Sequence, residues 1–181
     1  MELETRRCGY DCRAQDPYPE VRAQGRNPRY AEAILSNVGG SNSEMTAVSL
    51  YFYDHLVTAG VPEVAQAFHA ISEVEMHHLE IFGTLALQLG ADPRLWSAQQ
   101  GRRAWWTPEY NHYARKLGPI IQDAVRSERA CIRKYESQLR WIRDENVAAN
   151  LRRILQDEHL HLDMLSCLYT AYVGTGMPPG C

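Results

Sequence analysis

The chain has 181 residues, of which 45% are hydrophobic and 23% charged, a balance typical of one folded domain. With 19 basic and 22 acidic side chains the formal net charge is −3, so charge gives no reason to expect a nucleic acid or an anionic membrane as a partner. The opening sequence MELETRRCGYDC has no apolar segment typical of a secretory signal, and no apolar run approaches the roughly 20 residues that span a bilayer. We therefore expect a soluble, cytoplasmic protein.

Residues 1–27 lack hydrophobic periodicity and contain Gly, Pro, Asp and Arg, which predicts an N-terminal arm. Cys8 and Cys12 lie in this arm with C-x3-C spacing. One such pair cannot by itself complete a four-sulfur zinc or iron site. We expect ordinary thiols, with a redox pair and half of an intersubunit site as the alternatives.

A helix interrupted by glycines is expected next. Asn27 followed by Pro28 is typical of a helix start, and this helix runs toward Val38. The sequence GGSN at residues 39–42 interrupts it, and helicity resumes over residues 43–58.

Three further helices are expected at residues 62–90, 119–143 and 147–173, followed by a C-terminal tail at residues 174–181. Residues 91–117, which contain three of the four tryptophans, form a long connection. Short links make neighbouring helices antiparallel, whereas the long link can run the length of the bundle. The prediction for residues 28–173 is an all-α, ferritin-like four-helix bundle with a long crossover between the second and third helices.

The helix expected at residues 62–90 carries an apolar stripe that must face the bundle axis. Its apolar members recur in steps of four and three: Val64, Phe68, Ile71, Phe82, Leu85 and Leu89. Glu75 and His78 occupy the middle of the stripe, and their spacing places both side chains on one face. The last helix repeats the pattern with Glu158 and His161 at its centre.

The other two helices each contribute one inward carboxylate, Glu44 on the first and Glu128 on the third. Four buried carboxylates repel one another and lose hydration, so positive charge must lie among them. Two divalent cations would neutralise the four carboxylates. Carboxylates combined with two imidazoles suit iron or manganese.

A third Glu-x-x-His motif, formed by Glu109 and His112, lies in the long connection. No apolar heptad surrounds it, so we expect it to bind no metal. The alternative for the whole pattern is a set of solvated helices in which Glu and His side chains pair without a metal.

Two segments resemble those of a known superfamily. The segment GGSNSEMTAVSLYFY resembles the start of the first ligand helix of manganese catalases, with Ser43 in place of a Gly. The segment VEMHHLEIFGTLALQLGADP resembles the second helix of rubrerythrins equally well. The chain is thus similar to the ferritin-like dimetal carboxylate proteins, which include rubrerythrins, bacterioferritins and manganese catalases.

The resemblance implies the metal ligands Glu44, Glu75, His78, Glu128, Glu158 and His161. It also implies that Asp157 accepts a hydrogen bond from the imidazole of His78, since a ligating imidazole needs its other N–H held. Asp157 directly precedes Glu158, but the residue that directly precedes Glu75 is Val74. The imidazole of His161 therefore has no evident carboxylate partner. Cys131 stands where rubrerythrins carry a further carboxylate.

The function implied is that of a non-haem dinuclear oxidoreductase with two divalent ions, iron or manganese, acting on hydrogen peroxide as a catalase or peroxidase. O₂ is the other candidate substrate, and a peroxidase would need an external electron-donor protein. The alternatives are a ferroxidase or iron-handling protein, and a non-catalytic bundle that metals only hold together. Because ferritin-like bundles usually pair, we expect a homodimer or a higher homo-oligomer.

Tyr51 and Tyr135 follow Glu44 and Glu128 on the same stripes. We expect them to pack in the core with hydrogen-bonded hydroxyls. A redox or proton role beside the metals is the alternative.

Overall fold

The computed structural model describes residues 11–99 and 102–174, and Cys8 lies outside these ranges. Within them the chain forms α-helices, one hairpin and one short 3-10 helix. The helices are α1 (Pro28–Gly39), α2 (Glu44–Val57), α3 (Pro62–Gln88), α4 (Leu117–Leu139) and α5 (Glu145–Tyr172); the strands are β1 (Trp96–Gln99) and β2 (Arg102–Trp105), and the 3-10 helix is Pro108–Tyr110. No described helix combines the length and apolar character that crossing a membrane requires.

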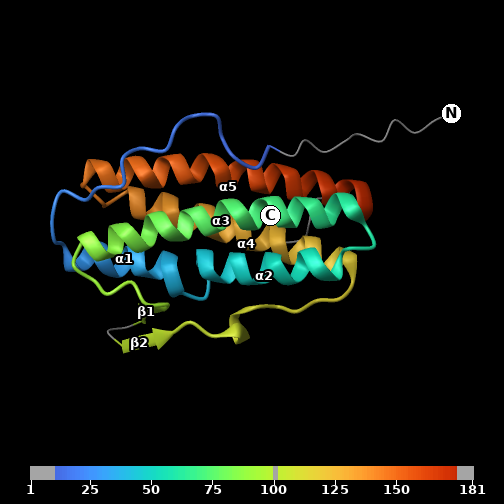
Figure 1. Cartoon of the computed structure of the whole chain (residues 1–181), viewed down its shortest axis with the longest axis horizontal. Coiled ribbons are helices and arrows are strands. Elements are labelled where there is room, and N and C mark those ends of the chain that lie inside the picture. The colour runs from blue at the N-terminus through green and yellow to red at the C-terminus, as the bar shows by residue number, and fades with distance from the viewer. Residues whose placement is uncertain (1–10, 100–101, 175–181) are drawn as a thin grey trace.

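The long helices lie side by side as a bundle (Figure 1). α1 and α2 follow each other along α3 and together act as the first helix of four. α2 packs chiefly against α3, α4 packs against α5, and α3 also contacts α5. The colours of Figure 1 show that α3 and α4 run in the same direction and α5 in the opposite one. The predicted all-α bundle with a crossover between its second and third helices is confirmed.

Side-chain caps define where three of the helices begin. The side chain of Asn27 accepts a hydrogen bond from the N–H of Tyr30 at the start of α1. Ser43 accepts one from the N–H of Thr46 at the start of α2, and Asp144 caps α5 in the same manner. Each cap satisfies an N–H group that has no partner within its own helix.

The boundaries of α4 differ from those predicted. The helix begins at Leu117, which places Pro119 in the first turn, where a missing N–H removes no helical hydrogen bond. It ends at Leu139 and not at residue 143, because the N–H groups of Arg140 and Trp141 bond to carbonyl groups only three residues back.

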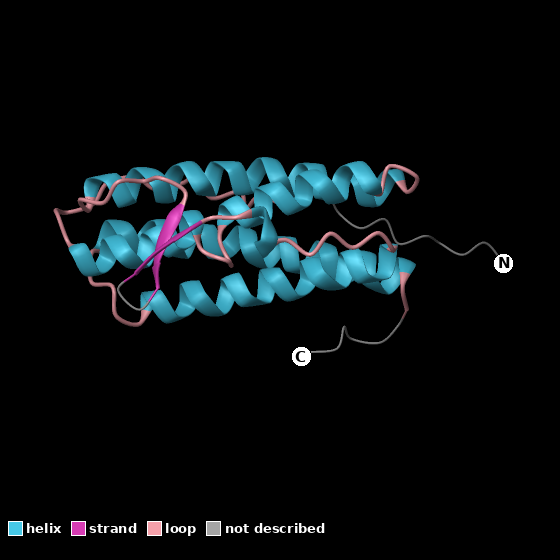
Figure 2. Ribbon diagram, turned by 90° about the horizontal axis from the view of Figure 1, so that it is seen from below, coloured by secondary structure: helices cyan, strands magenta, loops and turns pink. Residues whose placement is uncertain are grey.

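The long connection contains an antiparallel hairpin that the sequence did not predict. β1 pairs with β2 in a register that sets Trp96 opposite Trp105. The guanidinium carbon of Arg103 lies 4.3 Å from the centre of the Trp96 ring, a cation–π contact that helps to order the pair. Figure 2 shows this hairpin crossing the outside of the bundle.

Gly39, the last residue of α1, allows the hairpin to approach closely. A Cβ atom at this position would lie 2.3 Å from the backbone nitrogen of Trp96 and 2.6 Å from the carbonyl carbon of Leu95. The indole N–H of Trp106 donates to Thr46 Oγ1 at 3.0 Å and ties the connection to the first turn of α2 as well. The glycine break is therefore the place where the crossover docks.

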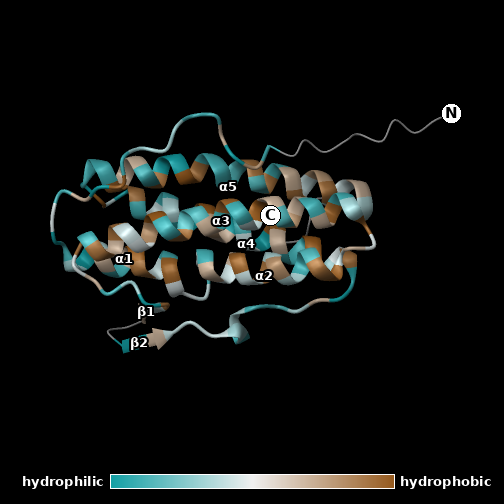
Figure 3. Cartoon of the chain, viewed as in Figure 1, coloured by the Kyte–Doolittle hydropathy of each residue, from teal (hydrophilic) through white to brown (hydrophobic). Residues whose placement is uncertain are grey.

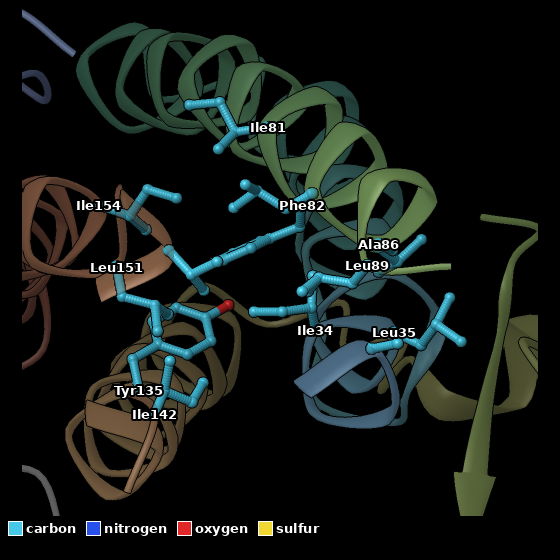
Figure 4. Packing of buried hydrophobic residues seen from close by; sticks show 14 of the residues in the cluster. Ile34, Leu35, Ile81, Phe82, Ala86, Leu89, Tyr135, Ile142, Leu151 and Ile154 are labelled. Atoms are coloured by element: carbon cyan, nitrogen blue, oxygen red, sulfur yellow. The ribbon is translucent and has the colours of Figure 1, made fainter. Parts of the chain in front are cut away.

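Two hydrophobic clusters fill the bundle. The first cluster includes Tyr51, Phe68, Ile71, Ile121 and Leu165. The second cluster includes Ile34, Phe82, Tyr135, Leu151 and Ile154, which Figure 4 shows packed together. Figure 3 shows hydrophobic and hydrophilic residues distributed around each long helix, as expected when one face is buried. Along α3 and α5 the Glu-x-x-His motifs lie between members of the two clusters.

The N-terminal strap (residues 11–24) runs along α5 without helix or strand (Figure 1). Cys12 is buried in the first hydrophobic cluster, and Tyr18 packs against the second. The strap thus passes over the part of α5 that contains Asp157 and lies between the two clusters.

Candidate metal centre

The motif residues predicted to face inward do so, midway along the bundle. All six are buried, with exposed fractions from 0 to 2%: Glu44, Glu75, His78, Glu128, Glu158 and His161. On α3 and α5 the Glu and the His lie one turn apart on the same face. α2 and α4 add one carboxylate each from the opposite side of the bundle.

These residues form two overlapping groups, in each of which one carboxylate oxygen or ring nitrogen from every residue lies within 4.8 Å of those of the others. The first group is Glu44, Glu75, His78 and Glu158, and the second is Glu75, Glu128, Glu158 and His161. Glu75 and Glu158 belong to both groups. Three carboxylates and one imidazole per group, with two carboxylates shared, is a donor set suited to two adjacent divalent ions.

The two imidazoles present the same nitrogen to the carboxylates. His78 Nδ1 lies 3.0 Å from Glu75 Oε2 and 3.3 Å from Glu158 Oε1. His161 Nδ1 lies 3.2 Å from Glu75 Oε1 and 3.8 Å from Glu128 Oε2. Each ring therefore directs Nδ1 toward the shared carboxylate of Glu75 and toward one other carboxylate of its own group.

Many polar atoms of the centre have no hydrogen-bond partner among the described residues. They are Glu44 Oε2, Glu75 Oε1, Glu128 Oε2, both carboxylate oxygens of Glu158 and both ring nitrogens of His161. Leaving such an atom buried and unpaired costs about 1–3 kcal/mol, and more for a charged group. Coordinated cations would satisfy most of these atoms at once, so the donor set fits a pair of metal ions.

Burial and neighbouring charge shift the pKa values of the buried carboxylates in different directions. Burial, and then the charge of Glu75, raises the pKa of Glu44 to about 8. Burial, and then the charges of the other carboxylates, raises the pKa of Glu158 well above its usual range. Burial also acts to raise the pKa of Glu75, but His161 and His78 outweigh it and hold that pKa below its usual range. Protons and cations therefore compete for the cluster, and metal binding should weaken as the pH falls.

Two tyrosines hold the outer carboxylates from the opposite helix. The hydroxyl of Tyr135 on α4 donates to Glu44 Oε1 at 2.6 Å, and the hydroxyl of Tyr51 on α2 donates to Glu128 Oε1. Burial, and then the adjacent carboxylate, raises the pKa of each phenol well above its usual range, so both keep their protons. The second oxygen of each carboxylate stays available to a metal ion.

Asp157 lies where the sequence placed it, against His78. Its Oδ2 accepts from His78 Nε2 at 3.0 Å. Its Oδ1 accepts from Arg153 Nη1 at 2.6 Å, and the hydroxyl of Tyr18 donates to Oδ2 at 2.6 Å. Sequence reasoning missed both Arg153 and Tyr18. Tyr18 carried no signal because it lies in an aperiodic segment, whereas the i, i+4 spacing of Arg153 and Asp157 was visible.

Three other residues singled out in the sequence belong to neither of the two groups. Glu109 and His112 are exposed in the crossover and belong to neither group. Cys131 is buried one turn from Glu128, but its Sγ donates to Asn42 Oδ1 at 3.2 Å and it also belongs to neither group.

Comparisons with known proteins agree with this architecture. A family model described as rubrerythrin matches residues 40–169, the part of the chain that contains both groups. Two solved structures of KatB, a manganese catalase from Anabaena PCC7120, share 20% identity with this chain at TM-scores of 0.77 and 0.76. The similarity covers 92% and 93% of this chain and 86% of each KatB chain, and at this identity it establishes a shared fold. A comparison with curated proteins gave no match.

Proposed function

Because the chain belongs to the rubrerythrin family, we propose that it is a dinuclear metal oxidoreductase acting on hydrogen peroxide. The observation that carries the proposal is the pair of overlapping groups, each with three carboxylates and one imidazole. Family membership also agrees with the resemblance to ferritin-like dimetal carboxylate proteins that the sequence indicated.

The proposed ligands are the six residues of the two groups, with Glu75 and Glu158 shared between the ions. Glu44 and His78 would complete one position, and Glu128 and His161 the other. Two ions of iron or manganese held in this way would supply two electrons to, or accept two electrons from, one substrate molecule. Four carboxylates balance four positive charges, which favours the divalent state of both ions in the resting protein.

The burial of the centre supports a very small substrate. The exposed fractions of the six residues do not exceed 2%, so side chains of a protein or a nucleotide cannot reach them directly. Hydrogen peroxide and O₂ are small enough to enter a site of this kind. The buried phenols of Tyr51 and Tyr135 hold the outer carboxylates in place and are the nearest neutral proton carriers to them.

Oxygen evolution tests the proposal. Metal-free protein is loaded with Mn²⁺ or, separately, with Fe²⁺, hydrogen peroxide is added, and oxygen is followed with an electrode. Sustained evolution near one O₂ per two peroxides is expected if peroxide also supplies the electrons for reduction. Peroxide loss that stops after one turnover would indicate a peroxidase that needs an electron-donor protein. No peroxide loss with either metal would contradict the proposal.

A pair of matched variants controls this assay. Glu75→Gln removes a carboxylate shared by both groups, and we expect it to lower peroxide turnover by at least about 100-fold and to lower bound metal below two ions per chain. Glu109→Gln makes the same chemical change in the Glu-x-x-His motif of the long connection, and it should retain both the wild-type peroxide turnover and two bound ions. Two ions bound in Glu75→Gln would refute the ligand assignment.

A further inference from the structure

The N-terminal strap supplies half of the hydrogen bonds that hold Asp157. The backbone N–H of Ala14 donates to Asp157 Oδ1 at 2.7 Å, and the hydroxyl of Tyr18 donates to Oδ2 at 2.6 Å. Arg153 and His78 supply the other two donors from α5 and α3. Because Asp157 is fully buried, these four donors and not water set the orientation of its carboxylate.

Arg153 and the strap fix each other. Arg153 Nε donates to the carbonyl oxygen of Asp16 at 2.7 Å, and Nη2 donates to that of Ala14 at 2.8 Å. The guanidinium carbon of Arg153 lies 4.1 Å from the centre of the Tyr18 ring, and that of Arg13 lies 4.9 Å from it. Two guanidinium groups therefore hold the Tyr18 ring in the position that brings its hydroxyl to Asp157.

This arrangement determines which nitrogen of His78 carries the proton. Asp157 accepts the hydrogen of Nε2, so Nδ1, which faces Glu75 and Glu158, is the nitrogen that would give up its proton and bind a metal ion. A metal-binding imidazole that donates its other N–H to a carboxylate is better oriented and more basic, and loss of such a partner typically lowers metal affinity about 10- to 100-fold.

His161 has no equivalent support. Neither of its ring nitrogens has a hydrogen-bond partner among the described residues. Both groups contain Glu75, Glu158, one outer carboxylate held by a tyrosine, and one imidazole. The strap and Asp157 support the imidazole of the first group, and the ammonium group of Lys134, which acts on Glu44, is a second difference between the groups.

We propose that the N-terminal strap is part of the metal centre, and that Tyr18, acting through Asp157 as a positioning residue for His78, makes the Glu44–Glu75–His78–Glu158 group the tighter of two unequal metal positions. The inference rests on the metal-binding part of the proposed function and is independent of the reaction that the centre performs. The N-terminal strap, which lies outside the helical bundle, would then directly affect metal binding.

Metal titration of the full chain tests this inference. Metal-free wild type, Tyr18→Phe and Tyr53→Phe are titrated with Co²⁺ and with Mn²⁺ by calorimetry, and the visible absorption of Co²⁺ is recorded after the first equivalent. Tyr18→Phe keeps the ring and removes only the hydroxyl. Tyr53→Phe is the matched control, because the Tyr53 hydroxyl donates to the carbonyl oxygen of Ala114, away from Asp157.

Wild type and Tyr53→Phe should both bind two ions in unequal steps. Tyr18→Phe should weaken the tighter step by about 10-fold or more, leave the weaker step within about twofold, and change the Co²⁺ spectrum of the first equivalent. Asp157→Asn should weaken the same step at least as much.

Four results would overturn the inference. They are equal steps in wild type, an unchanged first step in Tyr18→Phe, equal weakening of both steps, and an unchanged Co²⁺ spectrum. These results leave the dimetal proposal standing if two ions still bind. Absence of any metal binding in wild type would instead refute the proposed function itself.

Discussion

Asp54 is a buried carboxylate that belongs to neither group of the metal centre. It lies on α2, is 2% exposed, and its Oδ1 has no hydrogen-bond partner among the described residues. Burial, and then the charge of Asp123, raises the pKa of Asp54 to about 8. An Asp in an unfolded chain has a pKa near 3.9, so between about pH 4 and pH 8 the folded chain holds a proton that the unfolded chain has lost. This residue therefore favours folding at low pH, and its contribution is lost as the pH rises through that window.

We predict that Asp54→Asn stabilises the protein increasingly as the pH rises. Near pH 4.5 the variant and wild type should have similar melting temperatures. At pH 8 the variant should melt at least about 2–4 °C higher, the shift that about 1 kcal/mol produces in a chain of this size. Circular dichroism of metal-free samples measures the difference, because the other carboxylates are common to both proteins. The exposed Asp163 provides the control, since Asp163→Asn should show no such trend. A difference that stays constant with pH would show that Asp54 is ionised throughout.

At the scale of elements, the junction between α1 and α2 depends on partners far along the chain. The carbonyl oxygens of Ser36 and Asn42, which the end of α1 and the break leave free, accept from Lys134 Nζ on α4. On the outer side the hairpin lies directly against Gly39. The break is thus a packed joint that lets α2 begin at Glu44 and direct that carboxylate into the core.

Gly39→Ala should therefore destabilise the protein by about 1–3 kcal/mol, because the added Cβ would overlap the backbone of Leu95 and Trp96. Gly83→Ala, in the middle of α3, places a Cβ where no atom lies within 4 Å and should stabilise the protein by about 0.5–1 kcal/mol through helix propensity. Urea denaturation of the two variants measures both effects. Small and equal changes in the free energy of unfolding of both variants would show that the hairpin does not pack closely against Gly39.

At the scale of the whole molecule, the metal centre divides the hydrophobic core. The two clusters meet at a belt of carboxylates and imidazoles, several of whose atoms lack hydrogen-bond partners among the described residues. That belt opposes folding unless cations satisfy it, so metal binding and stability must be linked. A homodimeric or higher assembly remains a prediction from the sequence, and the particle mass in solution is the measurement that checks it.

Removal of metal should lower the melting temperature of the protein. An ion present at about 1,000 times its dissociation constant adds about 4 kcal/mol per site to the free energy of unfolding. For each site this corresponds to a shift in melting temperature of roughly 8–16 °C in a chain of this size. Differential scanning calorimetry of metal-loaded protein with and without a chelator measures this shift. Glu109→Gln should show the full shift and Glu75→Gln a smaller one. A melting temperature that chelation leaves unchanged would show that the six residues do not hold metal.

The long helices, the crossover topology and the burial of six Glu and His residues could be predicted from the sequence. Those features follow from local periodicity, because a stripe that repeats in steps of four and three can bury only one face of a helix, and every residue on that face is buried with it. The bounds of α4 differ from the predicted ones, because the end of a helix depends on which carbonyl groups the next few N–H groups reach.

Most of the residues that surround the centre could not be predicted, because they come from distant parts of the chain. Tyr51 reaches Glu128, Tyr135 reaches Glu44, and Tyr18 reaches Asp157, over separations of 77, 91 and 139 residues. No local pattern connects positions so far apart, and Tyr18 lies in a segment with no periodicity at all. The hairpin at Gly39 is a further case, because its docking depends on the space beside one missing Cβ atom. Packing between distant segments, which local periodicity does not encode, placed Asp157 and Tyr18 beside His78.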